Sequence, residues 1–245
     1  MLKGSLRILV IILFSVTGFI VFSIESEFLA VGNIKIVRPE PLIIKREDIN
    51  IIIEKNGEVR VDTFYTFKNI GKYNIKSTFM FWLDKNILDN PENKLTNVKN
   101  KYIKNIKFFS DYKKTENLRA VINFDEKVYE EQTGENIQRD WYAISKVIPS
   151  NEEGYLGVYY YLINTDFEKR GQLIFSFDLV NNFNNKNLAE ILYINIHNKS
   201  DRKIGSIDYK GYLFNNIQKK NSNIQHFELL AGNVSLDGKL IINFR

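Results

Sequence analysis

Residues 49–67 read INIIIEKNGEVRVDTFYTF, and this stretch decides the fold. Isoleucines at positions 49, 51 and 53 alternate with other residues before the Asn56-Gly57 pair. A second alternating set follows it: Val59, Val61, Thr63, Tyr65 and Phe67. Because successive side chains of a strand point to opposite faces, this period of two indicates two half-buried strands. Asn-Gly between two such runs predicts a hairpin, since the favoured tight turn needs positive φ at both central residues.

The same alternation recurs along the rest of the chain. Residues 75–83 place Ser77, Phe79, Phe81 and Leu83 on one face. Residues 84–104 are polar and predict a long loop. Further strands are predicted at residues 106–109, 118–124, 141–148, 155–163, 172–179, 191–197, 207–214, 225–230 and 232–244. The last run contains Asp237-Gly238, which predicts a second hairpin turn.

Many short strands with few helical stretches indicate an all-β protein. Residues 155–163 are apolar on both faces, which predicts a central strand covered on both sides. We expect residues 46–245 to form an antiparallel β-sandwich. It is either one extended sandwich or two small ones that divide near residues 125–139.

One apolar segment, Ile8–Ile24, precedes this body. Lys3 and Arg7 lie before it, and two glutamates follow it. This charge order favours an N-terminus that stays inside while the body crosses the membrane. The segment lies just above the ~7–15 apolar residues of a signal peptide and at the lower limit of the ~17–25 of a spanning helix. Residues 1–24 are therefore predicted to be a hydrophobic helix, either a signal peptide or a membrane anchor. The body is expected to be extracytoplasmic: periplasmic, secreted or anchored with its C-terminal part outside.

Residues 25–45 are predicted to be an extended linker. Pro39 and Pro41 favour an extended backbone and disfavour helix. Two interpretations stay open for this segment. It is a stiff spacer that holds the body off the membrane, or an edge segment of the body itself.

Composition excludes several classes of protein. The chain has 245 residues, 44% of them hydrophobic and 26% charged, which is typical of a globular protein. It has no cysteine, which excludes disulfides, thiolate metal sites and a cysteine nucleophile. The net charge is +5, but the basic runs Lys113-Lys114 and Lys219-Lys220 are isolated, so no nucleic-acid partner is expected. Frequent Ile, Asn and Lys are typical of an AT-rich bacterial genome.

Three short motifs follow one another between Leu42 and Leu83. They are Leu42-Ile43-Ile44-Lys45-Arg46-Glu47-Asp48-Ile49, Tyr65-Thr66-Phe67-Lys68-Asn69 and Phe79-Met80-Phe81-Trp82-Leu83. This stretch resembles the opening of an uncharacterised family of exported bacterial β-rich proteins, a domain of unknown function. The third motif departs from the family, which prefers a proline-containing end there. The resemblance implies an extracytoplasmic β protein, and it carries over no functional residue.

No motif predicts catalysis, a metal site or a cofactor. The two histidines, His197 and His226, have no zinc-type spacing. The doublets Glu130-Glu131 and Glu152-Glu153 suggest the carboxylate pair of a glycoside hydrolase. Neighbouring residues on a strand point to opposite faces, so neither doublet forms that pair alone, and a pair drawn from both stays open. We expect no catalytic residue, no metal ligand, no cofactor and no enzymatic activity.

Aromatic side chains are the candidates for binding. Trp82, Trp141 and Tyr160, the last between Tyr159 and Tyr161, either fill the core or lie exposed, where they can stack on sugars or contact a protein. The predicted function is an exported, non-enzymatic β-sandwich of the bacterial cell envelope that binds or assembles with an unknown partner. The alternative is a carbohydrate-binding or carbohydrate-active module that uses surface aromatics. The partner is an envelope protein or a glycan, and Ile8–Ile24 contacts the membrane if it is not cleaved.

Overall fold

The computed structural model describes residues 29–31, 35–36, 40–85, 103–114, 117–118, 121–130, 135–162, 171–177 and 188–245. Every regular element in these ranges is a strand, which confirms the all-β prediction for this part of the chain. Within the same ranges no helix is long and apolar enough to cross a membrane. The predicted apolar helix, Ile8–Ile24, lies outside the described residues.

The strands form three sheets. The large sheet has eight strands in the order β14-β15-β12-β3-β4-β10-β6-β7. Their bounds are Asn215–Asn216 for β14, Gln225–Ser235 for β15, Leu188–Asn198 for β12, Leu42–Ile53 for β3, Val59–Asn69 for β4, Glu153–Leu162 for β10, Ile103–Phe109 for β6 and Asn117–Leu118 for β7.

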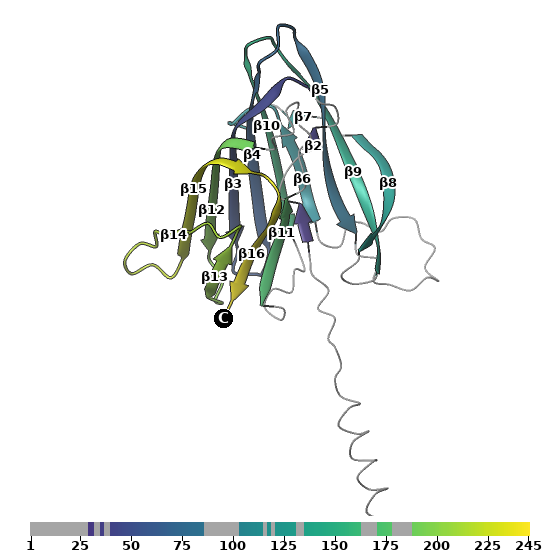
Figure 1. Cartoon of the computed structure of the whole chain (residues 1–245). Helices are drawn as coiled ribbons and strands as arrows, with labels where there is room; N and C mark the ends of the chain where they lie inside the picture. The colour runs from purple at the N-terminus through teal and green to yellow at the C-terminus, as the bar shows by residue number, and fades with distance from the viewer. Residues whose placement is uncertain are drawn as a thin grey trace, which may run out of the picture.

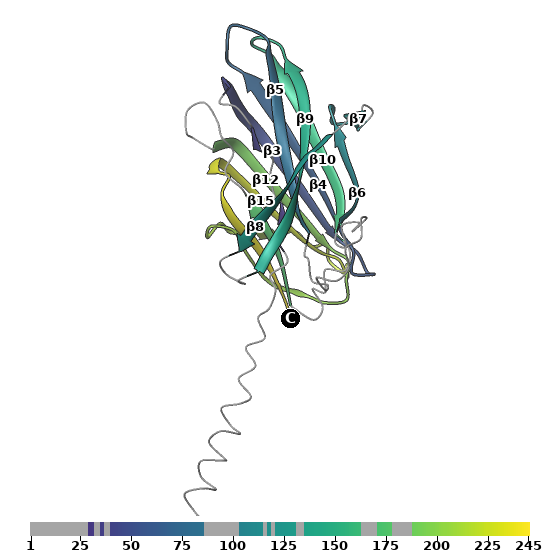
Figure 2. The same ribbon diagram turned by 90° about the vertical axis from the view of Figure 1, so that its right-hand side faces the viewer.

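Two smaller sheets have four strands each. The first has the order β1-β11-β16-β13, with bounds Leu29–Val31, Gln172–Phe177, Gly238–Phe244 and Ile204–Asp208. The second has the order β2-β5-β9-β8, with bounds Lys35–Ile36, Ile75–Lys85, Glu135–Ile148 and Val121–Glu130. In Figures 1 and 2 both small sheets form a second layer against the large sheet.

A single hydrophobic core lies between the layers. Phe79 of β5 packs on Phe67 of β4 with ring centroids 4.8 Å apart, and Phe81 of β5 lies 5.7 Å from Tyr160 of β10. Buried residues of the other small sheet, among them Phe175 and Leu240, belong to the same core. The inner face of the large sheet is therefore covered, and its outer face is available for a site.

The predicted hairpin of residues 49–67 is confirmed. Strands β3 and β4 are antiparallel, with Ile53 opposite Val59, and the predicted alternating residues face the core. The turn itself differs from the prediction, because only Gly57 has positive φ, at 79°, and Asn56 does not. The Glu54 N–H donates to the Glu58 carbonyl at 2.8 Å, which closes a three-residue loop with one left-handed residue.

Two of the three sheets are mixed, whereas the sequence predicted purely antiparallel pairing. β12 lies parallel to β3, and β1 lies parallel to β11. Parallel neighbours need a crossover connection. Here the chain leaves β10 of the large sheet, passes through β11 of the second layer and returns as β12 beside β3.

The predicted hairpin at Asp237-Gly238 is wrong. Gly238 has positive φ, at 89°, so the chain does turn sharply there. However, β15 pairs with β12 in the large sheet, and β16 pairs with β11 and β13 in a small sheet. The turn carries the chain from one layer to the other, because an Asp-Gly turn permits a sharp bend without determining which strands pair.

The predicted linker contributes strands to the body. β1 pairs with β11, β2 pairs with β5, and β3 begins at Leu42. In the stretch 125–139, where a division was considered, residues 125–130 lie in β8 and residues 135–139 in β9, and these strands pair antiparallel in one sheet.

Candidate ligand-binding site

A β-bulge in β3 determines which of its polar side chains reach the outer face. The register with β4 shifts between Ile44 and Arg46. Ile44 and Glu47 are both buried as a result, while Arg46 and Asp48 lie on the outer face. A bulge inserts one extra residue and thereby redirects the side chains beyond it, and bulges are common beside functional sites.

Side chains from three neighbouring strands meet on this outer face. Asp48 of β3 lies between Tyr193 of β12 and Phe64 of β4, and Asn50 lies opposite Asp62. They line a hollow of about 350 Å³, together with two side chains from the segment after β6. We call this hollow the trough and define it by Arg46, Asp48, Asn50, Asp62, Phe64, Tyr112, Lys114 and Tyr193.

One wall of the trough is an aromatic stack. The ring of Tyr112 lies on the ring of Phe64, with centroids 4.0 Å apart and planes at 17°. The Tyr112 hydroxyl makes a hydrogen bond with the Thr66 hydroxyl. The Phe64 ring lies against Gly157 of β10, where a Cβ would come within 2.6 Å of it. The missing side chain of Gly157 therefore makes room for the stack.

The trough is electrostatically balanced. The Arg46 Nε–H lies 2.8 and 2.9 Å from the two carboxylate oxygens of Asp48, and this bond raises the pKa of Arg46. The Lys114 ammonium forms an ion pair with Asp62. It also lies 5.1 Å from the centroid of the Tyr159 ring. Two cations are thus matched by two carboxylates.

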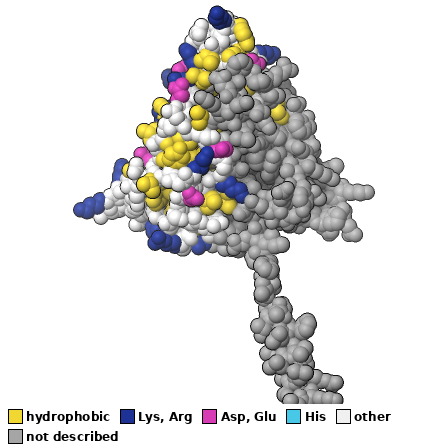
Figure 3. All heavy atoms as spheres, viewed as in Figure 1, with side chains coloured by type: hydrophobic (Ala, Val, Ile, Leu, Met, Phe, Trp, Pro, Cys, Tyr) yellow, Lys and Arg dark blue, Asp and Glu magenta, His cyan; other side chains and the backbone are white. Residues whose placement is uncertain are grey.

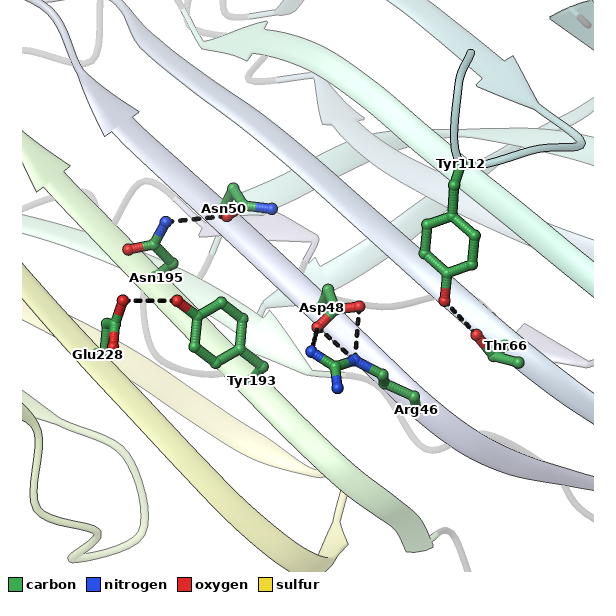
Figure 4. A network of polar contacts seen from close by, with 8 residues as sticks. All are labelled: Arg46, Asp48, Asn50, Thr66, Tyr112, Tyr193, Asn195 and Glu228. Carbon is green, nitrogen blue, oxygen red and sulfur yellow. Dashed lines mark hydrogen bonds and ion pairs between the residues drawn. The ribbon is translucent and has the colours of Figure 1, made fainter. Parts of the chain in front are cut away.

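The opposite wall is Tyr193. Its hydroxyl donates to Glu228 at 2.7 Å, and burial, followed by this contact, raises the pKa of Tyr193 to about 12. Figure 4 shows Tyr193 and Tyr112 on opposite sides of the Arg46–Asp48 pair. The floor continues at Asn50, whose side-chain oxygen accepts from the Asn195 amide at 3.0 Å.

The two histidines lie together beside the trough. The register of β12 with β15 places His197 opposite His226, and their rings stack with centroids 3.8 Å apart. Asn195 contacts both rings, at 3.1 Å from His197 and 2.6 Å from His226. Burial lowers the pKa of His197, and the charge of His226 lowers it further. Within the described part of the chain, no three His, Asp or Glu side chains are grouped to hold a metal.

Of the three predicted binding aromatics, Tyr160 has a described side chain, and it does not line the trough. Tyr160 is only 1% exposed and packs on Phe81 in the core, so it cannot serve as an exposed aromatic. Trp82 and Trp141 are paired in register across β5 and β9, but their side chains lie outside the described part of the structure. Tyr159 and Tyr161 are half-exposed on the outer face of β10, with centroids 5.4 Å apart.

The two glutamate doublets lie in different layers or outside the described part. Glu130 ends β8 in a small sheet, and Glu131 is not described. Glu152 and Glu153 are exposed at the start of β10. Glu153 accepts a hydrogen bond from the Tyr155 hydroxyl at 3.2 Å.

The sequence analysis missed the trough. Its residues come from β3, β4, β12 and the segment after β6, and their adjacency depends on sheet order. One signal was available in the sequence. Phe64 lies on the polar side of an alternating strand, and an aromatic side chain at such a position indicates either a covering segment or a ligand.

No protein-family model matches the chain, and no curated protein matches it. The structure resembles a candidate nutrient-binding protein from Legionella pneumophila, with a TM-score of 0.58 at 11% identity. This match covers 88% of the present chain and 71% of the Legionella chain.

Two further solved structures are less similar. An M1 zinc metallopeptidase from Deinococcus radiodurans gives a TM-score of 0.42 at 11% identity, over 83% of this chain and 42% of that one. Yeast LTA4 hydrolase gives a TM-score of 0.39 at 10% identity, over 83% of this chain and 29% of that one. The fold comparison therefore rests on the Legionella protein, and at this identity it concerns the fold alone.

Proposed function

We propose that the protein is a non-enzymatic, extracytoplasmic binding protein that holds its ligand in the trough. The observation that carries the proposal is the trough itself, a polar hollow of about 350 Å³ between Tyr112 and Tyr193. Small-molecule sites are concave, contain aromatic side chains and hold a few convergent polar groups. The trough has these three properties.

The walls and floor are held in place before any ligand arrives. Phe64 and Thr66 fix Tyr112, Glu228 fixes Tyr193, and Arg46 and Asp48 fix each other. A ligand therefore orders few side chains on binding, and preorganisation of this kind lowers the entropic cost of association.

Binding is favoured over glycoside hydrolysis by the ion pairs. Hydrolysis needs two carboxyl groups that flank the scissile bond, one of them a protonated general acid. Two carboxylates do line the trough, Asp48 and Asp62, but each is paired with a cation. Each carboxylate is held by its own ion pair, so the two are not arranged as a free pair on either side of a glycosidic bond.

A small ligand is favoured over a large protein partner. On the described part of the face seen in Figure 3, hydrophobic side chains are interspersed with charged ones, as on an ordinary solvated surface. The trough has the dimensions of a small-molecule site. The Legionella protein of similar fold is described as binding a nutrient, which agrees with this choice.

A thermal-shift screen tests the trough. The purified chain is heated with solutes from several classes: sugars, amino acids, nucleosides and small organic acids. A solute at a hundred times its dissociation constant adds about 2.7 kcal/mol to the free energy of unfolding. The expected result is stabilisation by one class, which is lost in the double variant Arg46→Gln, Asp48→Asn.

The double variant removes both charges of the pair, so that no unpaired charge remains. Its matched control is Glu54→Gln, Lys199→Gln, which removes an ion pair of 3.1 Å outside the trough. Equal stabilisation of wild type, trough variant and control contradicts the site. Absence of any stabilising solute contradicts the function.

Export is the second part of the proposal and is supported by the charge order around Ile8–Ile24. Mass spectrometry of the N-terminus, with cell fractionation, measures it. A chain that begins near residue 24 or 33 and is found outside the cell membrane indicates a cleaved signal peptide. A chain that keeps Met1 and is found in the membrane fraction indicates an anchor. Full-length chain in the cytosol contradicts export.

A further inference from the structure

The charge balance of the trough bears on the kind of ligand it can hold. Arg46 is paired with Asp48, and Lys114 with Asp62. A charged ligand adds a charge for which the two pairs leave no opposite charge in the trough, and an unmatched charge in a partly buried site is costly. An uncharged ligand avoids this cost and leaves both pairs intact.

The floor offers donors and acceptors in close proximity. A guanidinium has five N–H donors and a carboxylate has about four acceptor positions, so one mutual ion pair does not exhaust either group. The Asn50 amide adds both a donor and an acceptor. Neighbouring hydroxyl groups, each able to donate and accept, match such a floor.

The two walls of the trough are aromatic. Tyr193 is on β12 and Phe64 is on β4, with β3 between these strands, and Tyr112 of the segment after β6 lies on the Phe64 ring. Neighbouring strands are ~4.8 Å apart, so β12 and β4, which carry Tyr193 and Phe64, lie about 10 Å apart. The hollow of about 350 Å³ between these walls is large enough for one saturated ring. Its C–H groups carry slight positive charge and are attracted to the negative face of an aromatic ring.

We propose that the ligand of the trough is an uncharged carbohydrate, with a sugar ring between Tyr112 and Tyr193 and its hydroxyls on Arg46, Asp48 and Asn50. This inference rests on the function proposed above and names the class of its ligand. A sugar combines the two surfaces that the trough requires, an apolar C–H face and an edge of uncharged hydroxyl groups. The protein binds it without transferring any group.

Saturation-transfer NMR on the full chain in detergent tests the ligand class. The probes are neutral hexoses, pentoses and their short oligomers, with α-amino acids, sugar phosphates and nucleosides for comparison. The expected result is transfer of saturation from the protein to the protons of at least one neutral saccharide. Tyr193→Ala and Tyr112→Ala each weaken its binding about tenfold, since each removes one stacking wall.

Two variants serve as matched controls. Tyr193→Phe keeps the ring but loses the hydroxyl that contacts Glu228, and it retains binding within about threefold. Tyr73→Ala removes a tyrosine that is 58% exposed outside the trough, and it leaves binding unchanged. Circular dichroism of every variant confirms that the sheets are intact.

Ionic strength provides a second measurement. The affinity of an uncharged ligand stays constant between low and high salt, because screening acts only on charges. A charged ligand of the same trough loses affinity as salt is added.

The outcomes separate the two proposals. Trough-dependent binding of an amino acid or a phosphate ester, with no saccharide bound, overturns the carbohydrate and retains the binding function. Saccharide binding that survives both Tyr193→Ala and Tyr112→Ala overturns the site. If no probe binds in a trough-dependent way, both proposals are overturned.

Discussion

At the scale of single residues, the bulge of β3 sends Arg46 and Glu47 to opposite faces of the sheet. Arg46 pairs with Asp48 in the trough. Glu47 is 0% exposed, and neither of its carboxylate oxygens has a hydrogen bond of ordinary geometry among the described residues. Burial raises the pKa of Glu47 to about 8, although the Tyr65 hydroxyl acts in the opposite direction. An ionised carboxylate is costly in the interior, so the core favours the protonated form.

The stability of the protein should therefore decrease as the pH rises from about 4.5 to about 8. Over this range the folded state binds a proton at Glu47 that the unfolded state has released, and stability falls wherever the folded state holds more protons. The substitution Glu47→Gln should remove this dependence of stability on pH, because glutamine does not titrate. At pH 8 the variant should be more stable than the wild type by a few kcal/mol, since each pKa unit corresponds to ~1.4 kcal/mol.

Urea denaturation at pH 5, 7 and 8 measures the effect, with Glu152→Gln, at an exposed position, as the control. The wild type and Glu152→Gln should lose stability in parallel, and Glu47→Gln should not. If the free energy of unfolding changed with pH in the same way in all three proteins, Glu47 would not be the protonated group.

Gly157 is a second residue with a definite role. An added methyl group would lie 2.6 Å from the Phe64 ring and would displace the stack with Tyr112. Gly157→Ala should cost about 1–3 kcal/mol, as overpacking usually does. Gly232→Ala is the control, because its Cβ would meet only a carbonyl oxygen at 3.5 Å. Denaturation midpoints measure both, and equal stability of the two variants would refute the close approach.

At the scale of elements, the β3–β4 hairpin shows how a turn and a register act together. Alternate isoleucines of β3 and valines of β4 face the core, and the pair nearest the loop is Ile53 opposite Val59. Gly57 closes the loop at a φ of 79°. The same hairpin carries five residues of the trough, so its register also aligns the floor of the site.

Gly57→Ala should destabilise the protein by about 1–2 kcal/mol, because a Cβ is disfavoured at left-handed φ. Lys55→Ala changes an exposed residue of the same loop and should stay within about 0.5 kcal/mol of the wild type. Thermal denaturation measures both variants. A neutral Gly57→Ala would show that the loop can adopt another turn.

At the scale of the whole molecule, the two layers share one core. Residues of both small sheets and of the large sheet belong to a single buried cluster. The sequence left open one or two sandwiches, and a common core indicates one cooperative unit.

Unfolding should therefore proceed in a single transition that fluorescence and circular dichroism report together. Phe79→Ala in one small sheet and Leu240→Ala in the other should each lower the stability of that same transition by about 2–5 kcal/mol. Two separate transitions, each sensitive to one of these variants, would contradict a common core.

The sequence by itself determined the local structure of the protein. Alternation predicted the core-facing residues of β3, β4 and β5, and residues 155–163 were correctly placed as a central strand, β10. The further prediction that this strand is covered on both sides is wrong, since Tyr159 and Tyr161 on its outer face stay half-exposed. Side-chain period is a local property, so it can be read without knowledge of the partner strands.

The tertiary structure alone decided the order of the strands and therefore the site. β12 returns parallel to β3, and this pairing places Tyr193 beside Asp48 and Asn195 beside Asn50. The pairing of β12 with β15 likewise stacks His197 on His226. Residues 145 positions apart, such as Asn50 and Asn195, meet only after the chain has crossed between layers. The sequence pattern of one strand records which face is buried, but pairing depends on the packing of all strands into two layers.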